Sequence, residues 1–509
     1  MNKFLFLIFI SISINLFSQP TIEWETNLGG SDDEWAHSIQ QTTDGGYIIA
    51  GYSQSNNNDV GGNNGFEDYW IVKLDTSGAL MWETNLGGSG HDRAYSIQQT
   101  NDGGYIVVGE SESNDGDVGG NNGGYDYWIV KLDASGSLVW ETNLGGSNND
   151  LVQSIQQTTD GGYIVSGESA SNDGDVGGNY GNVDYWIVKL DVSGGIIWET
   201  NLGGSNSDSA QSIQQTTDGG YIVAGVSVSD DGDVGGNYGS WDSWIVKLDT
   251  SGDLVWETNL GGSEWDRAYS IQLTTDGGYI LAGFSWSNDG DVGGNNGESD
   301  CWIVKLDASG DLVWETNLGG SDWDWAHDIK QVANGGYIVA GTSRSNNGDV
   351  GGNNGSADYW IVKLDEDGGL VWETNLGGNN YERAFSIQQT NNGGFIVAGE
   401  SSSNDGDVGG NLGIRDYWIV KLGTDLSVGD YLISDTIEIY PNPVENNFTI
   451  NNILEEITKV EILDLQGRII LIKNNPLNNL VDISKLQPAI YIVKVYASKN
   501  IYTQKIIKK

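Results

Sequence analysis

The chain has 509 residues, a formal net charge of −48 and a single cysteine, Cys301, which excludes an intrachain disulfide. Of its 71 acidic residues, 64 precede residue 437, whereas residues 437–509 hold 9 Lys and Arg against 7 Asp and Glu. Such an acidic surface repels nucleic acid and anionic lipid, so we expect neither as a partner. It would attract cations, or it serves solubility in a salty medium.

The chain begins with a segment typical of a secretory signal. Lys3 precedes an almost wholly apolar run from Phe4 to Leu16, and Ser18-Gln19 follow where cleavage is expected. This run is too short to span a membrane, and no later segment is apolar for 18 residues. We therefore predict a signal peptide over residues 1–18 and no transmembrane segment.

A block of 58 residues then repeats seven times without insertion or deletion. Trp-Glu-Thr-Asn-Leu-Gly-Gly begins at residues 24, 82, 140, 198, 256, 314 and 372, and Trp-Ile-Val-Lys-Leu at residues 70, 128, 186, 244, 302, 360 and 418. In the copy at 92–149, strands are predicted over 94–100, 105–111, 126–132 and 137–144, with tight turns at 101–104 and 133–136. Four antiparallel strands in each repeat are typical of a β-propeller blade.

The ends of the array indicate how the ring closes. The first copy opens on a fourth-strand sequence at residues 22–28, whereas the last copy ends after its third strand at residue 422. The N-terminal strand can therefore complete the seventh blade and remove an open edge. We expect an all-β, seven-bladed propeller over residues 21–422, with the repeated tryptophans packed between blades. Gly-Gly before the second strand and Trp on the fourth make these blades resemble kelch-type blades.

The composition changes after a short polar linker at residues 423–436: Gly becomes rare, and Ile, Asn and Lys increase. The motifs that follow, in order, are Ile439-Tyr-Pro-Asn-Pro443, Phe448-Thr-Ile450, Val460-Glu-Ile-Leu-Asp-Leu-Gln-Gly-Arg468, Ala489-Ile-Tyr-Ile-Val-Lys-Val495 and Lys505-Ile-Ile-Lys-Lys509. Residues 437–509 thereby resemble the type A C-terminal sorting domain of cargo of the type IX secretion system of Bacteroidota. The resemblance implies a small immunoglobulin-like β-sandwich that the outer-membrane translocon reads, and a protein that is secreted or attached to the outer cell surface.

Aspartates recur in the long loop between the second and third strands. In the second copy, Asp115, Asp117 and Asp126 stand at positions 1, 3 and 12 with Gly120 at position 6, which is part of the spacing of a 12-residue Ca²⁺ loop. Position 5 is Gly119, which has no side-chain oxygen. The aspartates either bind structural Ca²⁺ or cap turns. The candidate ligands are Asp59, Asp68, Asp115, Asp117, Asp126, Asp173, Asp175, Asp184, Asp231, Asp233, Asp242, Asp289, Asp291, Asp300, Asp349, Asp358, Asp405, Asp407 and Asp416.

The copies diverge mainly where one blade connects to the next. On both sides of a recurring acidic residue the sequence varies towards Trp, Tyr and Arg, which are enriched at recognition sites. Exposed Trp and Tyr can stack on sugar rings; alternatively, these residues pack at the channel entrance or have drifted. The connections share a face with the long loops, where Trp241 and Trp286 also fall. The candidate ligand-binding residues are Trp35, Arg93, Trp265, Arg267, Trp323, Trp325, Tyr381 and Arg383.

Signals for catalysis are weak. The three histidines, His37, His91 and His327, occur in no Ser-His-Asp order or zinc spacing, and no carboxylate pair stands out among the uniform acidic repeats. We therefore expect a monomeric, non-enzymatic propeller that binds a polysaccharide or a cell-surface component through its loop-rich face. The alternatives are an extracellular glycan hydrolase or lyase on a propeller scaffold, and a purely structural surface module.

Overall fold

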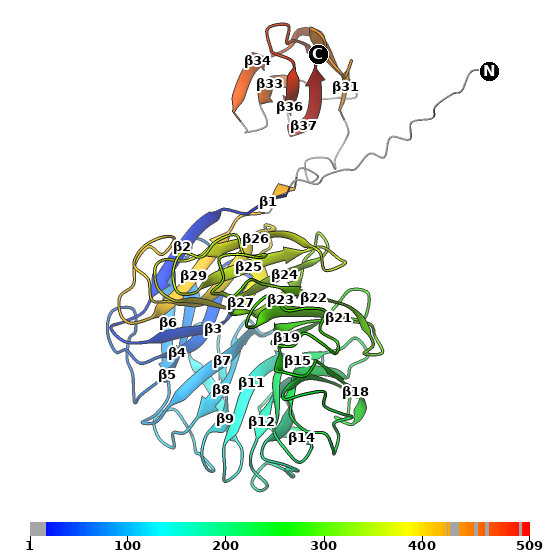
Figure 1. Cartoon of the computed structure of the whole chain (residues 1–509). Helices are drawn as coiled ribbons and strands as arrows, with labels where there is room; N and C mark the ends of the chain where they lie inside the picture. The colour runs from blue at the N-terminus through cyan, green and yellow to red at the C-terminus, as the bar shows by residue number, and fades with distance from the viewer. Residues whose placement is uncertain (1–16, 425, 428–436, 452–456, 464–467, 498–500) are drawn as a thin grey trace, which may run out of the picture. The chain divides into compact units, whose positions relative to one another are not determined.

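The computed structural model describes residues 17–424, 426–427, 437–451, 457–463, 468–497 and 501–509. Contacts divide the chain into two units, one of residues 19–424 and one of residues 1–18 with 425–509. In the larger unit, seven four-stranded antiparallel sheets follow one another around a ring, as predicted (Figure 1). Nearly all of the predicted signal peptide and most of the predicted linker lie outside the described residues.

The seven blades share one strand order. In blades 1 to 6 the four strands follow one another outward in chain order, and in blade 7 the N-terminus supplies the outer strand. Blade 1 contains β3 (Glu34–Gln41), β4 (Tyr47–Ser53), β5 (Asp68–Leu74) and β6 (Leu80–Leu86). Blade 2 contains β7 (Asp92–Gln99), β8 (Tyr105–Ser111), β9 (Asp126–Leu132) and β10 (Leu138–Leu144). Blade 3 contains β11 (Asp150–Gln157), β12 (Tyr163–Ser169), β13 (Asp184–Leu190) and β14 (Ile196–Leu202). Blade 4 contains β15 (Asp208–Gln215), β16 (Tyr221–Ser227), β17 (Asp242–Leu248) and β18 (Leu254–Leu260).

Blade 5 contains β19 (Asp266–Leu273), β20 (Tyr279–Ser285), β21 (Asp300–Leu306) and β22 (Leu312–Leu318). Blade 6 contains β23 (Asp324–Gln331), β24 (Tyr337–Ser343), β25 (Asp358–Leu364) and β26 (Leu370–Leu376). Blade 7 contains β27 (Glu382–Gln389), β28 (Phe395–Ser401), β29 (Asp416–Leu422) and, as its outer strand, the N-terminal β2 (Ile22–Leu28). Because β2 pairs antiparallel with β29, the predicted closure of the ring is confirmed.

The repeated tryptophans form the contacts between blades. Trp128 of blade 2 is fully buried, and its ring lies 4.5 Å from that of Tyr69 in blade 1. The Tyr69 hydroxyl also donates a hydrogen bond to the Trp128 carbonyl oxygen at 2.8 Å. On the outer strand, Trp82 meets Tyr105 of blade 2 edge-on at 5.8 Å. Burying each such ring stabilises the interface by about 2–3 kcal/mol.

Each inner strand contains one β-bulge. Between β7 and β8 the register shifts between Ala94 and Ser96, so Tyr95 has no partner across the ladder. Gly109 lies opposite, where a Cβ atom would stand 1.9 Å from the carbonyl oxygen of Arg93, and only glycine fits so close an approach. A bulge redirects the side chain that it releases. The seven bulge residues are His37, Tyr95, Gln153, Gln211, Tyr269, His327 and Phe385.

The second unit is a small β-sandwich. One sheet contains β31 (Glu438–Tyr440), β32 (Asn447–Asn451) and β35 (Leu480–Asp482), and the other contains β34 (Ile469–Asn474), β33 (Ile457–Leu463), β36 (Ala489–Ala497) and β37 (Ile501–Lys508). A 3₁₀ turn, η2 (Leu477–Asn479), precedes β35, and β1 (Phe17–Ser18) pairs with β30 (Leu426–Ser427). Buried Phe448, Val460 and Val493 belong to its core. Within the described part of the chain, no helix is long and apolar enough to cross a membrane.

Candidate functional site

Backbone hydrogen bonds bring three divergent positions side by side at every blade boundary. Between blades 4 and 5, Asp266 N donates to Trp241 O at 2.7 Å and Trp286 N donates to Trp265 O at 2.8 Å. The same two bonds recur at all seven boundaries. The triplets are Glu67, His91 and Glu112; Tyr125, Asn149 and Ala170; Val183, Ser207 and Val228; Trp241, Trp265 and Trp286; Ser299, Trp323 and Arg344; Ala357, Tyr381 and Ser402; Arg415, Asp33 and Gln54.

Tryptophans from blades 4, 5 and 6 line a cavity of about 450 Å³, hereafter the aromatic pocket. Ring centroids of Trp265 and Trp286 lie 5.8 Å apart, and those of Trp286 and Trp323 lie 6.5 Å apart. Trp323 stacks on Trp325 at 5.8 Å with the planes 8° apart. Trp265 is 49% exposed. The lining residues are Val226, Trp241, Trp265, Arg267, Tyr269, Phe284, Trp286, Trp323 and Trp325.

The aromatic pocket combines flat apolar faces with one guanidinium group. The Arg267 guanidinium lies 4.8 Å from the centre of the Tyr269 ring. Arg267 Nε and Trp286 Nε1 have no hydrogen-bond partner among the described residues, whereas Trp325 Nε1 donates to the Ser299 hydroxyl at 2.8 Å. The residues that line the pocket include no carboxylate. The pocket can therefore hold a flat or ring-shaped ligand and donate to its oxygens, but it lacks the carboxylate pair of a glycosidase.

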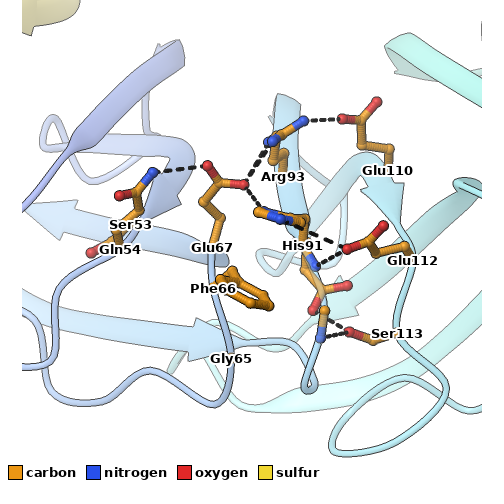
Figure 2. A network of polar contacts seen from close by, with 12 residues as sticks. Ser53, Gln54, Gly65, Phe66, Glu67, His91, Arg93, Glu110, Glu112 and Ser113 are labelled. Atoms are coloured by element: carbon orange, nitrogen blue, oxygen red, sulfur yellow. Dashed lines mark hydrogen bonds and ion pairs between the residues drawn. The ribbon is translucent and has the colours of Figure 1, made fainter.

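Arg93 is the equivalent of Arg267 in blade 2, but it belongs to an ion-pair network away from the aromatic pocket. It binds Glu67 at 2.8 Å and Glu110 at 3.0 Å (Figure 2). His91 also contacts Glu67, and its ring stacks on Phe66 at 4.8 Å. The Glu67 and Glu110 side chains are only 9% and 6% exposed. Arg93 therefore neutralises buried carboxylates rather than offering a free guanidinium.

The other predicted binding residues lie at the boundaries on either side of blade 7. Trp35 stacks on Tyr52 at 6.0 Å, and the Arg415 guanidinium lies 4.9 Å from the Trp35 ring centre. Arg383 lies 5.8 Å from the same ring centre. The Tyr381 hydroxyl accepts a hydrogen bond from Arg344 at 3.2 Å. These predicted residues therefore separate into clusters, and only Trp265, Arg267, Trp323 and Trp325 line the aromatic pocket.

Two histidines lie in the ring of bulge residues. His37 contacts Tyr95 at 5.0 Å and Phe385 at 4.9 Å, while His327 contacts Phe385 at 5.2 Å and Tyr269 at 5.3 Å. Burial, together with nearby arginines, lowers the pKa of both imidazoles to about 3. Both Nε2 atoms are buried without a partner among the described residues. The two rings are therefore uncharged at neutral pH.

The loop aspartates do not converge as the calcium prediction requires. Asp115 accepts from Ser89 N at 2.7 Å, Asp117 from Gly87 N at 3.3 Å, and Asp126 from Asn122 N at 2.6 Å. The corresponding aspartates of the other copies make the same kinds of bond. In the described part of the chain, no group of three or more His, Cys, Asp or Glu side chains is arranged to hold a metal ion. Turn capping accounts for these contacts, and calcium gains no support from them.

Burial raises the pKa of one aspartate in each blade. Asp126 has no exposed surface, and burial raises its pKa to about 7, with Asp150 and Asp175 of the next blade adding to the shift. Its Oδ1 atom has no hydrogen-bond partner among the described residues, and the same holds for the equivalent aspartate in all seven blades. The carboxylates that face Asp126 thus come from across the blade boundary, not from its own loop.

Sequence reasoning missed part of the aromatic pocket. Val226, Tyr269 and Phe284 also line it. Val226 and Phe284 occupy the same position of the second strand, where other blades carry Glu110, Glu168 or Thr342. Tyr269 lies on the first strand, where other blades carry Gln153 or Gln211. Arg344, which lies 4.6 Å from the Trp323 ring centre, was missed as well. A comparison of every divergent position, including those within the second strand, would have found all four.

Comparison with known proteins identifies the C-terminal unit. Residues 438–509 match the family described as secretion system C-terminal sorting domain, which confirms the predicted type IX sorting domain. The protein is therefore exported by the type IX secretion system, to the cell surface or beyond it. The presence of a sorting domain implies interaction with the secretion machinery.

The propeller has more distant likenesses. Residues 211–380 match the family described as arylsulfotransferase (ASST), and not kelch, so the kelch likeness is not supported. The regulatory protein FlaEY of Caulobacter vibrioides is 25% identical over 229 residues, which span 42% of this chain and 24% of that protein. A puromycin hydrolase structure is 12% identical with a TM-score of 0.43, over 92% of this chain and 59% of that one. Sqt1 from Chaetomium thermophilum is also 12% identical, with a TM-score of 0.39, over 75% of this chain and 83% of that one.

Proposed function

We propose that the exported propeller binds an extracellular polysaccharide in the aromatic pocket of blades 4 to 6. The observation that carries this proposal is the gathering of five tryptophans around one cavity of about 450 Å³. That volume falls within the ~300–1,000 Å³ range of small-molecule sites. Blade 3 carries Asn149, Leu151 and Ala170 where blade 5 carries Trp265, Arg267 and Trp286. The tryptophans are therefore additions to a blade that folds without them.

A sugar unit suits this chemistry on two counts. Its C–H faces can lie on the indole rings, and its oxygens can face the Arg267 guanidinium, which is the one charged group among the residues that line the pocket. Half-exposed Trp265 stands where an incoming chain would meet it first. A purely structural module has no use for such a pocket, because exposed aromatic surface favours unwanted association.

A glycan array distinguishes polysaccharide binding from a purely structural role. We expect the purified propeller to bind a subset of glycans, and Trp265→Ala and Trp323→Ala each to lose that signal. Tyr180→Ala is the matched control, because Tyr180 is an aromatic residue of the blade 3 loop, 67% exposed and outside the pocket. If wild type binds no glycan, or if both tryptophan variants bind as wild type does, the proposal fails.

A second candidate, sulfuryl transfer from an aryl sulfate, has one observation in its favour. The match to the arylsulfotransferase family spans residues 211–380, which include all nine pocket residues. An aryl ring could stack in the pocket with its sulfate near Arg267, and the uncharged His327 lies 6.4 Å from Trp325, ring centre to ring centre. Because His327 Nε2 is buried, we rank transfer below binding.

Turnover of p-nitrophenyl sulfate with a phenol acceptor tests this second candidate. The binding proposal predicts no p-nitrophenolate release above the uncatalysed rate. Release that disappears in His327→Gln but persists in His91→Gln would instead favour transfer, because His91 lies in the ion-pair network of blades 1 and 2.

A further inference from the structure

A second cavity lies in the central channel, towards the tight turns and away from the divergent positions. Its volume is about 820 Å³, and every inner strand contributes to it. In six blades the inner strand carries Ser-Ile-Gln at this level, whereas blade 6 carries Asp328-Ile-Lys330, of which Lys330 lines the cavity. Turn residues such as Thr275 and Gly335 form its rim.

Six glutamines of this cavity have amides of fixed orientation. The Gln40 Oε1 atom accepts a hydrogen bond from Gln99 N at 2.6 Å, and the equivalent bond joins five further pairs of neighbouring strands. Because a backbone N–H only donates, the amide oxygen must face it, and the amino group faces the other way. The six glutamines are Gln40, Gln98, Gln156, Gln214, Gln272 and Gln388.

The amino groups of these six glutamines have no acceptor among the described residues. Each carries two N–H donors, and the side chains that present them line the cavity. At the seventh position, Lys330 adds an ammonium group, which pairs with Asp328 at 2.5 Å. Asp328 also accepts from the Ser270 hydroxyl at 2.9 Å and from Ile387 N at 3.0 Å, so its charge is already shared among three donors. The ring of seven positions is thus rich in donors, and Glu366, on a turn at the rim, is the one carboxylate among the residues that line the cavity.

We infer that this channel binds a small oxyanion, a molecule bearing a sulfate, phosphate or carboxylate group, between the glutamine amino groups and Lys330. Such groups only accept hydrogen bonds, and charged acceptors form the stronger ones. A metal cation would face N–H groups and an ammonium, and a sugar hydroxyl would find few acceptors for its own proton. The strongly acidic surface opposes entry, but salt screens it beyond about 8 Å at physiological ionic strength. This site is independent of the aromatic pocket.

Calorimetric titration of the full chain with sodium sulfate, phosphate or citrate, against chloride at matched ionic strength, tests the inference. We expect saturable binding of at least one of these anions. Gln98→Glu and Gln214→Glu retain an oxygen for the neighbouring backbone N–H but replace two donors by a negative charge, and should weaken binding at least about tenfold. Ser137→Asp is the matched control, since it adds a charge on an exposed turn where blades 4 and 5 already carry Asp253 and Asp311.

Lys330 gives a second test, in which Asp328 keeps its hydrogen bonds from Ser270 and Ile387. Lys330→Gln restores the residue of the other six blades and should lower the affinity, while Lys330→Arg should retain it. Selective binding of citrate would identify a carboxylate ligand, and selective binding of sulfate or phosphate a tetrahedral one. The inference is overturned if no anion binds saturably, or if the Glu variants and Lys330→Gln bind as tightly as wild type.

Discussion

Trp418 Nε1 donates a hydrogen bond to the Glu25 carboxylate at 3.0 Å, and so joins two residues that are 393 positions apart in the chain. Trp128 and Glu141 make the same bond at 3.0 Å within blade 2, where the turn of 133–136 links their strands. In blade 7 no such turn exists, and β2 is held to β29 by non-covalent contacts alone. The ring is therefore weakest where its two ends meet.

Glu25→Ala and Glu141→Ala form a matched pair that tests this weakness. Each leaves an indole N–H without its partner, at a cost of about 1–3 kcal/mol in the free energy of unfolding. We expect hydrogen exchange in Glu25→Ala to show joint loss of protection in β2 and β29, whereas Glu141→Ala loses protection locally. Equal protection of β29 in the two variants would contradict closure by this strand.

The buried aspartates predict an unusual dependence of stability on pH. Because the folded-state pKa of Asp126 is raised from 3.8 to about 7, the folded chain binds this proton more tightly than the unfolded chain does. Stability from this group is complete below about pH 4 and is lost as the pH rises through 7, at up to ~1.4 kcal/mol per pH unit. Asp102 acts oppositely, since Thr100 and Lys131 hold its pKa at about 2, and its contribution is lost only as the pH falls through that value.

Urea unfolding at pH 5 and pH 8 measures this dependence. We expect the propeller to be more stable at pH 5, and Asp126→Asn to raise stability at pH 8 by roughly 1–2 kcal/mol while changing little at pH 5. The exposed Asp133 accepts bonds from Ser135 and Ser137, which lower its pKa, so Asp133→Asn should instead destabilise at pH 8. A wild type that is more stable at pH 8 would refute the assignment.

Arg93 and Arg267 occupy equivalent positions and should respond in opposite ways to the same change. Arg93→Met leaves the buried Glu67 and Glu110 without their cation, and should cost about 3–5 kcal/mol in stability with little effect on ligand binding. Arg267→Met removes a guanidinium that makes no close ion pair but whose charge favours the ionised form of the buried Glu168, so the loss of stability should be smaller than in Arg93→Met while affinity falls. Thermal unfolding and glycan titration of both variants check this. A large loss of stability in Arg267→Met would show that this arginine is structural too.

Removal of residues 437–509 should stop export without unfolding the propeller. The sorting domain is a separate unit with its own core, and the blades close without it. Cell fractionation with an antibody against the propeller should find the truncated chain inside the outer membrane and wild type at the surface or in the medium. Export of the truncated chain at the wild-type level would exclude the assigned role.

The period of the repeat carries most of the fold information. Two tryptophan motifs at a constant spacing of 58 residues predict the blades, and the misplaced fourth strand at residues 22–28 predicts the closure. The observed inner strand β7 begins at Asp92, two residues before the predicted start, because Asp92 N donates to Glu67 O across the blade boundary. Backbone hydrogen bonds between neighbouring blades cannot be predicted from the sequence of one repeat.

Contacts between neighbouring blades also explain why the composition of the sites could not be predicted from the sequence. The spacing of Asp115, Asp117 and Asp126 indicates a single ion, yet the carboxylate of Asp126 faces Asp150 and Asp175 of the next blade. Trp241, Trp265 and Trp286 are far apart in sequence, and two backbone hydrogen bonds bring them together. Residue types therefore predicted an aromatic recognition face, but not which residues share a pocket and which, like Arg93, neutralise buried charge.

Titration of the strongest glycan ligand into the wild type and the double variant Trp265→Ala/Trp323→Ala tests the central claim most directly. Loss of a hot-spot aromatic costs roughly 2 kcal/mol or more, so the dissociation constant should rise about thirtyfold for one residue and up to about a thousandfold for both. Tyr180→Ala should bind as wild type does. An unchanged dissociation constant in the double variant, with the fold intact by circular dichroism, would contradict binding in the aromatic pocket.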